Sequence, residues 1–304
     1  MTCLPTIRFI YRISTIIGIR RENGKEFGQV HRHEMSGALN GMMRVRTFCQ
    51  DDAHIFVQPG QIEDEISRVI ELIDHIYKVF GFEYKIELST RPEDFMGSEI
   101  LWDQAEKSLQ NVLDNRDIIY RVNEGDGAFY GPKIDFHILD ALKRCWQCGT
   151  IQLDFQMPEK FDLSYIGEDN QKHRPVVIHR AIYGSIDRFM GILTEHYSGA
   201  FPLWLSPVQA KLLPVSENYL NYAFQVKKSL DEAGIRVEVD IRDEKLGYKI
   251  REAQLEKVPF MLVLGENEKN SGTVAVRKRG EGDLGSKSIL DIIEQIKEGI
   301  HSKV

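Results

Sequence analysis

Cysteine is scarce in this sequence, with four residues in 304, too few for a disulfide framework. Because disulfides persist in oxidising compartments, a reducing compartment is the simpler inference, and we predict a cytoplasmic protein. No run of apolar residues is long enough to span a bilayer, which argues against a membrane protein. The sequence also has no phosphate-binding P-loop, dinucleotide-binding glycine pattern, internal repeat or low-complexity tract.

The chain has no excess of positive charge, since its formal net charge is −7. Residues 203–304 contain 16 Lys/Arg and 16 Asp/Glu, so residues 1–202, with the remaining 23 and 30, carry the whole deficit. A nucleic-acid partner must therefore meet local basic patches. The hydrophobic content of 42% and charged content of 28% are typical of a soluble globular protein, and the length allows two domains.

Acidic residues are missing from the first 21 positions, which contain four Arg. This composition is that of a weak organelle presequence. A secretory signal fits poorly because Arg8 and Arg12 interrupt the apolar segments. Targeting remains the minor alternative to a cytoplasmic location.

The first domain is expected to span residues 1–202. Residues 62–80 place apolar side chains at helical spacing, which predicts a long amphipathic helix. The segments YKIELSTRP, KIDFHILD and CWQCGTIQLDF alternate like strands, LWDQAEKSLQNVL is helical, and RPVVIHRAIYGSIDRFMGIL changes from strand to helix near Ser185. Antiparallel sheet with segregated helices indicates an α+β domain.

The second domain is expected to span residues 203–304, after the proline-containing boundary FPLWLSP. Its pattern alternates between strand and helix with short loops, which predicts a small α/β domain with a mostly parallel sheet. The expected elements are strand 209–214, helix 216–233, strand 235–241, helix 246–257, strands 259–265 and 273–277, and helix 287–300.

The stretch VHRHEMSGALNGMMRVRTFCQDDAHIF, residues 30–56, predicts a hairpin around the turn SGALNG. Side chains alternate across a strand, so small or apolar odd positions from Met43 onward share one face. The opposite face carries Arg44, Arg46, Phe48, Gln50, Asp52 and His54. A solvated sheet face and a ligand site explain this pattern about equally well.

Cys145 and Cys148 form a CxxC, but no second pair accompanies them. Residues three apart on a strand point to opposite faces, so two buried strand cysteines are the favoured interpretation over a metal site. His54 and His179 lie at strand positions beside polar residues, and spacing alone would not add Cys3 to them.

Several segments resemble the class II aminoacyl-tRNA synthetases. Residues 30–56 resemble motif 2 of that class, and GAFYGPKIDF, WQCGTIQLDF and PVVIHRAIYGSIDRFMGIL are similar to the threonyl-tRNA synthetase family. WLSPVQ, GIRVEVDIRDEKLGYKIREAQLEKVPFMLVLG and VAVRKRG resemble that family's anticodon-binding domain. The match begins near Glu26 and lacks motif 1, so we expect an N-terminally truncated member.

The resemblance implies a nucleotide site. Arg32 would hold the α-phosphate of ATP and the substrate carboxylate, Glu34 would orient the adenine amino group, and Phe48 would stack on the base. Arg44 and Arg188 would hold the outer phosphates with Mg²⁺, because a guanidinium stays charged and binds oxyanions bidentately. The implied catalytic residues are Arg32, Arg188 and Lys133, and Gln147 would also line the ATP site.

The resemblance also implies a zinc ion held by Cys3, His54 and His179, which would distinguish threonine from valine. The residues expected to contact threonine are Gln50, Asp52, Tyr130, Gln152 and Ser185. Glu268, Arg277 and Arg251 would contact the anticodon, although a solvated face accounts for each of them about as well.

The expected function is therefore ATP-dependent activation of threonine and its transfer to tRNA(Thr). The family forms homodimers, but a dimer is in doubt here because motif 1 is missing. The competing interpretation is a non-catalytic tRNA-binding fragment or paralogue with a regulatory or partner role. Retention of Arg32, Glu34, Arg44, Phe48 and Arg188 favours the enzyme over the pure binder.

Overall fold

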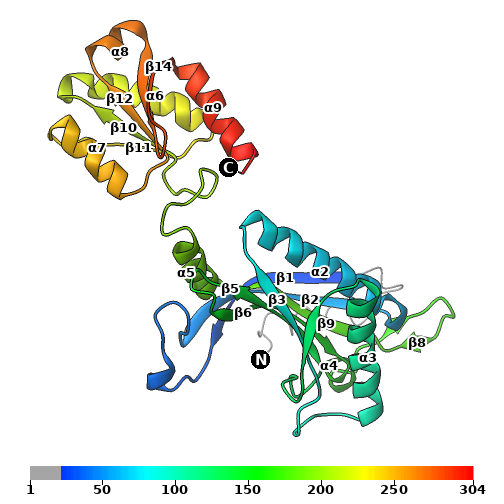
Figure 1. Ribbon diagram of the computed structural model, residues 1–304. Coiled ribbons are helices and arrows are strands. Elements are labelled where there is room, and N and C mark those ends of the chain that lie inside the picture. Colours follow the sequence, from blue (N-terminus) through cyan, green and yellow to red (C-terminus); the bar gives the residue numbers. More distant parts are fainter. Residues whose placement is uncertain (1–21, 304) are drawn as a thin grey trace. The chain divides into compact units, whose positions relative to one another are not determined.

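A computed structural model describes residues 22–303, which form two compact units that divide between residues 193 and 194 (Figure 1). The division lies shortly before the boundary expected at 202/203, which stays a prediction. Cys3 and the other residues of positions 1–21 lie outside the described residues. Within residues 22–303, every helix is too short or too polar to traverse a bilayer.

The first unit is built on a seven-stranded sheet in the order β1-β2-β9-β6-β5-β3-β4. All neighbouring pairs are antiparallel except β3 and β4. The strands are β1 (Glu22–His31), β2 (Thr47–Val57), β3 (Tyr84–Ser89), β4 (Tyr120–Asn123), β5 (Lys133–Leu139), β6 (Cys145–Asp154) and β9 (Val176–Ser185). A separate hairpin pairs β7 (Tyr165–Ile166) with β8 (Lys172–His173).

Two long helices accompany this sheet, α2 (Ile62–Val79) and α3 (Glu99–Asn115) (Figure 1). The apolar stripe of α2 packs on the sheet because its residues recur every three or four positions. Tyr77 fixes the contact, since its hydroxyl donates to the Ile182 carbonyl at 2.7 Å and accepts from the Gly149 amide at 2.9 Å. The short helix α4 (Gln156–Lys160) and α5 (Ile186–His196) follow β6 and β9.

The second unit has a five-stranded sheet in the order β11-β10-β12-β13-β14. Its strands are β10 (Ala210–Pro214), β11 (Val237–Val239), β12 (Phe260–Leu264), β13 (Thr273–Lys278) and β14 (Gly282–Ser288). Its helices are α6 (Leu220–Glu232), α7 (Leu246–Leu255), α8 (Glu266–Ser271) and α9 (Ile289–His301). One core cluster joins the sheet to α6 and α9, and another joins it to α7, so helices cover both faces.

The observed elements confirm most of the predicted ones and correct several. Only β10, β11 and β12 are parallel, and the antiparallel hairpin β13–β14 extends them, so the second sheet is mixed rather than mostly parallel. The patterns did not predict β4, α8 or β14. The hairpin of β1 and β2 is confirmed, but β2 begins at Thr47, so residues 42–46 belong to the connecting loop. The described residues also contain three 3₁₀ segments. These are η1 (Ser36–Ala38) in that loop, η2 (Pro59–Gln61) before α2 and η3 (Glu217–Tyr219) before α6.

Candidate functional site

Polar side chains line the face of the first sheet that turns away from α2, and strand pairing places them in rows. One row runs through Ser89, Lys133, Gln152, His179 and His54. The next row runs through Glu87, Asp135, Thr150, Ala181 and Asp52. Because opposite residues of paired strands lie within contact distance, these rows bring together residues from five strands.

The larger cavity on this face has a volume of about 380 Å³. The predicted residues that line it are Arg32, Gln50, Asp52, His54, Tyr130, Gln152 and His179. Thr150 and Arg180 contribute to the same wall. Four of the five residues predicted to contact threonine therefore lie around one space, whereas Ser185 does not line it.

A second cavity of about 130 Å³ adjoins the first, because Arg32, Gln50, Thr150 and Gln152 line both. The other predicted residues around it are Glu34, Arg44, Phe48, Gln147, Ser185 and Arg188. The expected ATP residues therefore surround the smaller space. Because the two cavities adjoin and their other lining residues differ, they can bind two substrates of one reaction.

Two imidazoles face each other in the larger cavity. His54 and His179 are register partners on β2 and β9, and their ring centroids lie 4.7 Å apart at an interplanar angle of 83°. His179 Nε2 lies 2.9 Å from Asp154 Oδ2. Burial, and next the charge of His179, lowers the pKa of His54 to about 4, so His54 is neutral near pH 7.

This pair fits a metal site in two respects. Metal ligation requires neutral imidazole, and a metal-binding histidine commonly donates its second ring nitrogen to a carboxylate, as His179 can to Asp154. Within residues 22–303 no group of three or more His, Cys, Asp or Glu side chains is arranged to hold a metal. Cys3, the third predicted ligand, lies outside those residues.

The loop before β5 brings Tyr130 to the same cavity. The Tyr130 hydroxyl donates to Gln152 Oε1, and its ring centroid lies 5.6 Å from that of His179. Burial, followed by the charges of Asp154 and Asp52, raises the pKa of Tyr130, so its hydroxyl keeps its proton. A Cβ at Gly131 would lie 1.8 Å from the Leu153 carbonyl oxygen, so only glycine lets the loop approach this closely.

Three guanidinium groups converge on the smaller cavity. Arg188 donates to the Met43 carbonyl at 2.8 Å and to the Gln147 carbonyl at 2.7 Å. Burial is the main cause that lowers the pKa of Arg188, and the positive charges of Arg32 and Arg44 lower it further. The guanidinium of Arg188 therefore lies where the binding of an anion would be favourable.

The other two guanidinium groups are held in different ways. Arg44 donates through Nε to Glu34 Oε2 at 3.0 Å, and a second nitrogen lies 2.9 Å from the same oxygen. The guanidinium of Arg32 lies over the ring of Phe48, 5.1 Å from its centroid, and Arg32 is exposed. Arg32 is thus in contact with an aromatic face and remains open to a ligand.

The position of α5, which carries Arg188, depends on a buried carboxylate that the sequence patterns did not single out. The pairing of β2 with β9 shifts between Gln50 and Asp52, so that β9 contains two extra residues there. The Asp51 carboxylate accepts the amides of residues 182, 183 and 184, each at 2.9 Å. It therefore satisfies the amides that the bulge leaves without strand partners.

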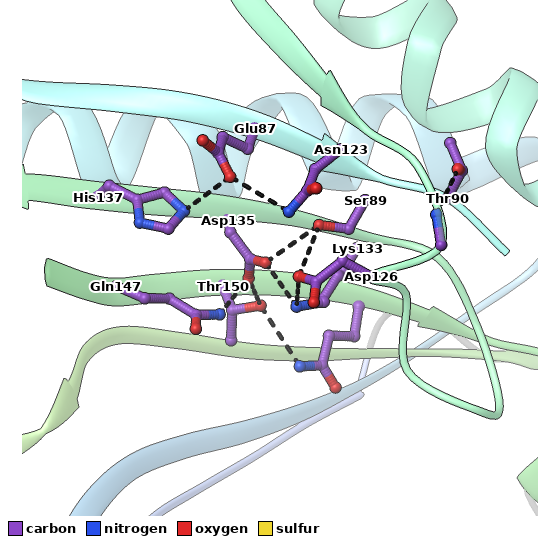
Figure 2. A network of polar contacts seen from close by, with 12 residues as sticks. Glu87, Ser89, Thr90, Asn123, Asp126, Lys133, Asp135, His137, Gln147 and Thr150 are labelled. Carbon is purple, nitrogen blue, oxygen red and sulfur yellow. Dashed lines mark hydrogen bonds and ion pairs between the residues drawn. The ribbon is translucent and has the colours of Figure 1, made fainter. Parts of the chain in front are cut away.

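Lys133 and Ser185 each have partners within the protein. Lys133 Nζ contacts Asp135 at 2.7 Å and Asp126 at 3.0 Å (Figure 2) and lines neither cavity. The Ser185 hydroxyl accepts the Arg188 amide at 3.2 Å at the start of α5. Ser185, which was predicted to contact threonine, lines the smaller cavity only, and the catalytic role predicted for Lys133 stays a prediction.

The cysteine prediction was half right. Cys148 is buried, but Cys145 is exposed, so the interpretation of two buried strand cysteines is wrong for Cys145. Cys148 occupies a bulge, because Phe136 pairs with Gly149 and His137 with Gln147. Burial raises the pKa of Cys148 to about 12, so its thiol stays protonated.

The predicted anticodon residues have local partners or lie exposed. Glu268 accepts the Gly265 amide at 2.9 Å at the start of α8. Arg277 on β13 donates to Asp283 at 3.2 Å, and Arg251 lies exposed on α7. No cavity described in the second unit is lined by them.

Sequence reasoning missed Thr150, Asp135, Asp154 and Asp51. A signal for three of them was present in the alternation of β5 and β6, since Asp135 shares a face with Lys133, and Thr150 and Asp154 share one with Gln152. Asp51 gave no such signal, because its partners are backbone amides.

Two family models match this chain. The model of the tRNA synthetase class II core domain (G, H, P, S and T) matches residues 20–197. The anticodon binding domain model matches residues 209–299. Together they cover the two units described above.

Known proteins match over nearly the whole chain. The threonine–tRNA ligase of Acetivibrio thermocellus is 63% identical over 278 residues, which are 91% of this chain and 44% of the relative. The threonine–tRNA ligase of Syntrophomonas wolfei is 62% identical over 279 residues, with 92% and 44% covered. This chain therefore spans less than half the length of these relatives.

Among solved structures, the RNA binding domain of threonyl-tRNA synthetase from Cryptosporidium parvum matches with a TM-score of 0.92 and 41% identity. The match covers 98% of this chain and 75% of that one.

Proposed function

Because this chain belongs to the threonyl-tRNA synthetase family of class II aminoacyl-tRNA synthetases, we propose that it is a threonine–tRNA ligase. ATP and threonine would give threonyl-adenylate and pyrophosphate. The threonyl group would then pass to the terminal hydroxyl of tRNA(Thr). The reducing compartment inferred from cysteine content agrees with a cytoplasmic location.

The observation that carries this proposal is the convergence of Arg32, Arg44 and Arg188 on a cavity that shares a wall with the histidine pair. An adenylate-forming reaction needs a polyanion held next to a carboxylate that attacks it. Fixed positive groups lower the barrier by stabilising the charge that develops on the α-phosphate. Positioning and electrostatics suffice, so no covalent nucleophile is required.

In the smaller cavity, Arg32 would bind the α-phosphate and the threonine carboxylate, which explains why it lines both spaces. Arg44 and Arg188 would bind the outer phosphates together with Mg²⁺. Phe48 would stack on adenine. Glu34 and Gln147 would contact the nucleotide from the loop and from β6, and the ion pair of Glu34 with Arg44 supports their placement.

In the larger cavity, Asp52 and Gln50 would face the threonine hydroxyl and Tyr130 would face its ammonium. Gln152 orients Tyr130 through their hydrogen bond. His54 and His179, with Cys3, would hold zinc. When bound, zinc would supply a Lewis-acid site that binds oxygen and so discriminates against the methyl group of valine.

The second unit would bind the anticodon through Glu268, Arg277 and Arg251. The resemblance to an anticodon-binding model over residues 209–299 supports this assignment to the unit as a whole. The homodimer that the resemblance implies is tested against a monomer by measuring the mass of the chain in solution.

Threonine-dependent exchange of labelled pyrophosphate into ATP tests the proposed function. Threonine is expected to support exchange, whereas valine, which lacks the hydroxyl, is expected to support at least about 10²-fold less. Binding of tRNA is measured on the same preparation. Absence of exchange together with intact tRNA binding would replace this proposal by the non-catalytic binder.

A further inference from the structure

A buried carboxylate beside the two cavities connects several of their residues (Figure 2). Asp135 on β5 is 1% exposed. Its Oδ1 accepts from Gln147 Nε2 at 2.6 Å and from Thr150 Oγ1 at 2.8 Å. Its Oδ2 lies 2.7 Å from Lys133 Nζ and 3.4 Å from Ser89 Oγ. A buried charge is tolerated only when its oxygens are paired, and this carboxylate has four partners, two on β6, one on β3 and one on β5 itself.

The partners of Asp135 lead into both cavities, although Asp135 lines neither of them. Gln147 lines the smaller cavity, and Thr150 lines both. Thr150 Oγ1 also accepts from Gln152 Nε2 at 3.4 Å, and Gln152 in turn accepts from the Tyr130 hydroxyl. A continuous chain of hydrogen bonds therefore runs from Asp135 to the wall of the larger cavity.

We propose that Asp135 is a positioning residue for adenylate formation, which holds the nucleotide side and the amino-acid side of the site in one fixed arrangement. This inference rests on the proposed function. One oxygen of Asp135 holds Gln147, which lines the smaller cavity, and Thr150, which lines both, while the other oxygen holds Lys133. Since misplacement of reacting groups by about 1 Å can cost about 10²-fold in rate, a shared anchor for both sides matters for kcat.

The charge of Asp135 also determines what Lys133 can do. Lys133 lies between two carboxylates of different burial, since the side chain of Asp135 is 2% exposed and that of Asp126 is 56% exposed. Burial acts to lower the pKa of Lys133, but the two carboxylates outweigh it and raise that pKa, so Lys133 is charged. An incoming anion can replace the exposed Asp126, while Asp135 continues to hold the ammonium group.

Glu87 offers a matched control on the same face of the sheet. It is the register partner of Asp135 on β3. Its carboxylate lies 3.4 Å from His137 Nε2 and 3.5 Å from Asn123 Nδ2 (Figure 2), and none of these three residues lines a cavity. Glu87→Gln therefore removes a carboxylate from the same face without removing a contact to the residues that Asp135 holds.

The experiment compares the rates of pyrophosphate exchange by Asp135→Asn and Glu87→Gln. Titration of the adenylate burst counts the active sites, so that kcat is expressed per active site. For Asp135→Asn we expect kcat per active site to fall about 10²-fold, with KM for ATP and threonine changed less than about threefold. Glu87→Gln is expected to stay within about threefold of wild type. A merely structural role would lower the active fraction and the melting temperature but not kcat per site, and that result would overturn the proposal.

Crystal structures of the wild type and of Asp135→Asn keep this inference separate from the proposed function, because they require no activity. We expect either Lys133 or Gln147 to leave the position it occupies beside residue 135, because the asparagine amide has only one acceptor oxygen, while the sheet is retained. Unchanged positions of both side chains would refute the anchoring role, even in an active enzyme. A wild type without exchange would refute the proposed function alone, and the two structures would still decide the role of Asp135.

Discussion

The two sheets of this molecule use their faces differently. Helices cover one face of the first sheet, and the other face carries the polar rows that line the cavities. The second sheet has helices on both faces, with α6 and α9 on one and α7 on the other. A sheet that is buried on both faces can offer ligands only its ends and edges. The first sheet therefore offers a ligand an open polar face, whereas the second sheet leaves only its ends and edges open.

The two units also differ in how some of their positively charged side chains are used. In the second unit, Lys249 is 3% exposed and donates to the carbonyls of Pro214 and Asp240, at the ends of two parallel strands. Arg279 likewise donates to backbone carbonyls. In the first unit, Arg32 remains exposed at the junction of the two cavities. Lys249 and Arg279 thus bind backbone carbonyls in the second unit, whereas Arg32 in the first unit is available to a ligand.

The largest effect that would sharpen this comparison is expected from Arg32→Ala. Removal of a guanidinium at the reacting phosphate should lower threonine-dependent pyrophosphate exchange by about 10³-fold or more, because the developing charge loses its fixed partner. The affinity for tRNA should change by less than about twofold, since the second unit is untouched. The control is Arg68→Ala, which removes an exposed guanidinium from α2 on the opposite side of the sheet. A large loss of tRNA affinity in Arg32→Ala would break the division between the units.

The next effect concerns the bulge that places α5, and it depends on pH. Burial, opposed by hydrogen bonds from the 182–184 amides and by Arg180, raises the pKa of Asp51 from its ordinary value of 3.8 to about 6 in the folded chain. The folded state therefore binds this proton more tightly than the unfolded state does. The stability that Asp51 contributes is complete below about pH 4 and is lost as the pH rises through 6.

Relative to Asp51→Asn, the free energy of unfolding of the wild type should fall by about 3 kcal/mol between pH 4 and pH 7.5, as denaturant titrations would measure. Asp140→Asn is the control. Burial of Asp140 is outweighed by hydrogen bonds from Trp146 and Arg144, which lower its pKa to about 2, so its contribution is lost only below this window. A parallel pH dependence of wild type and Asp51→Asn would disprove the assignment.

A third, smaller effect tests the histidine pair by metal affinity. Asp154→Asn should weaken zinc binding to the purified chain by about 10-fold to 100-fold, because His179 loses the carboxylate that orients its ring. The asparagine keeps an acceptor for the residue 156 and 157 amides that Asp154 also binds. Asp169→Asn, which alters the exposed pair with His173, should leave zinc affinity unchanged. Equal zinc affinity in both variants would argue against the metal site.

The smallest effect is expected at the rim of the second unit. Arg277→Ala should raise KM for tRNA about tenfold and leave pyrophosphate exchange unaltered, since one base or phosphate contact is worth about 1–3 kcal/mol. Lys228→Ala on the solvent side of α6 removes a similar charge and should change neither quantity. Reduced exchange in Arg277→Ala would mean that the two units are not as independent in function as their cores suggest.

The sequence was most informative where a strand has one polar face. The alternation of β2 correctly placed Gln50, Asp52 and His54 on one side, because side-chain direction follows from residue number alone. It could not show that His54 lies opposite His179, because the pairing of strands from distant parts of a chain depends on long-range contacts. Only the family resemblance placed these two histidines in one site.

Features that depart from regular pairing escaped prediction for a physical reason. A bulge has no signature in side-chain pattern, so neither the bulge at Cys148 nor the carboxylate of Asp51 that binds three amides could be foreseen. The second sheet gave the same difficulty, since strands buried on both faces do not alternate, and β14 contains few apolar residues.

The bulge opposite Asp51 also has a consequence for how this chain can vary. It adds two residues to β9, an even number, so side chains before and after it keep their sides of the sheet. Loss or gain of a single residue between Ile182 and Gly184 would invert Ser185 and everything aligned with it. We therefore expect related sequences to differ in length at this point by an even number of residues, which a comparison of those sequences can check.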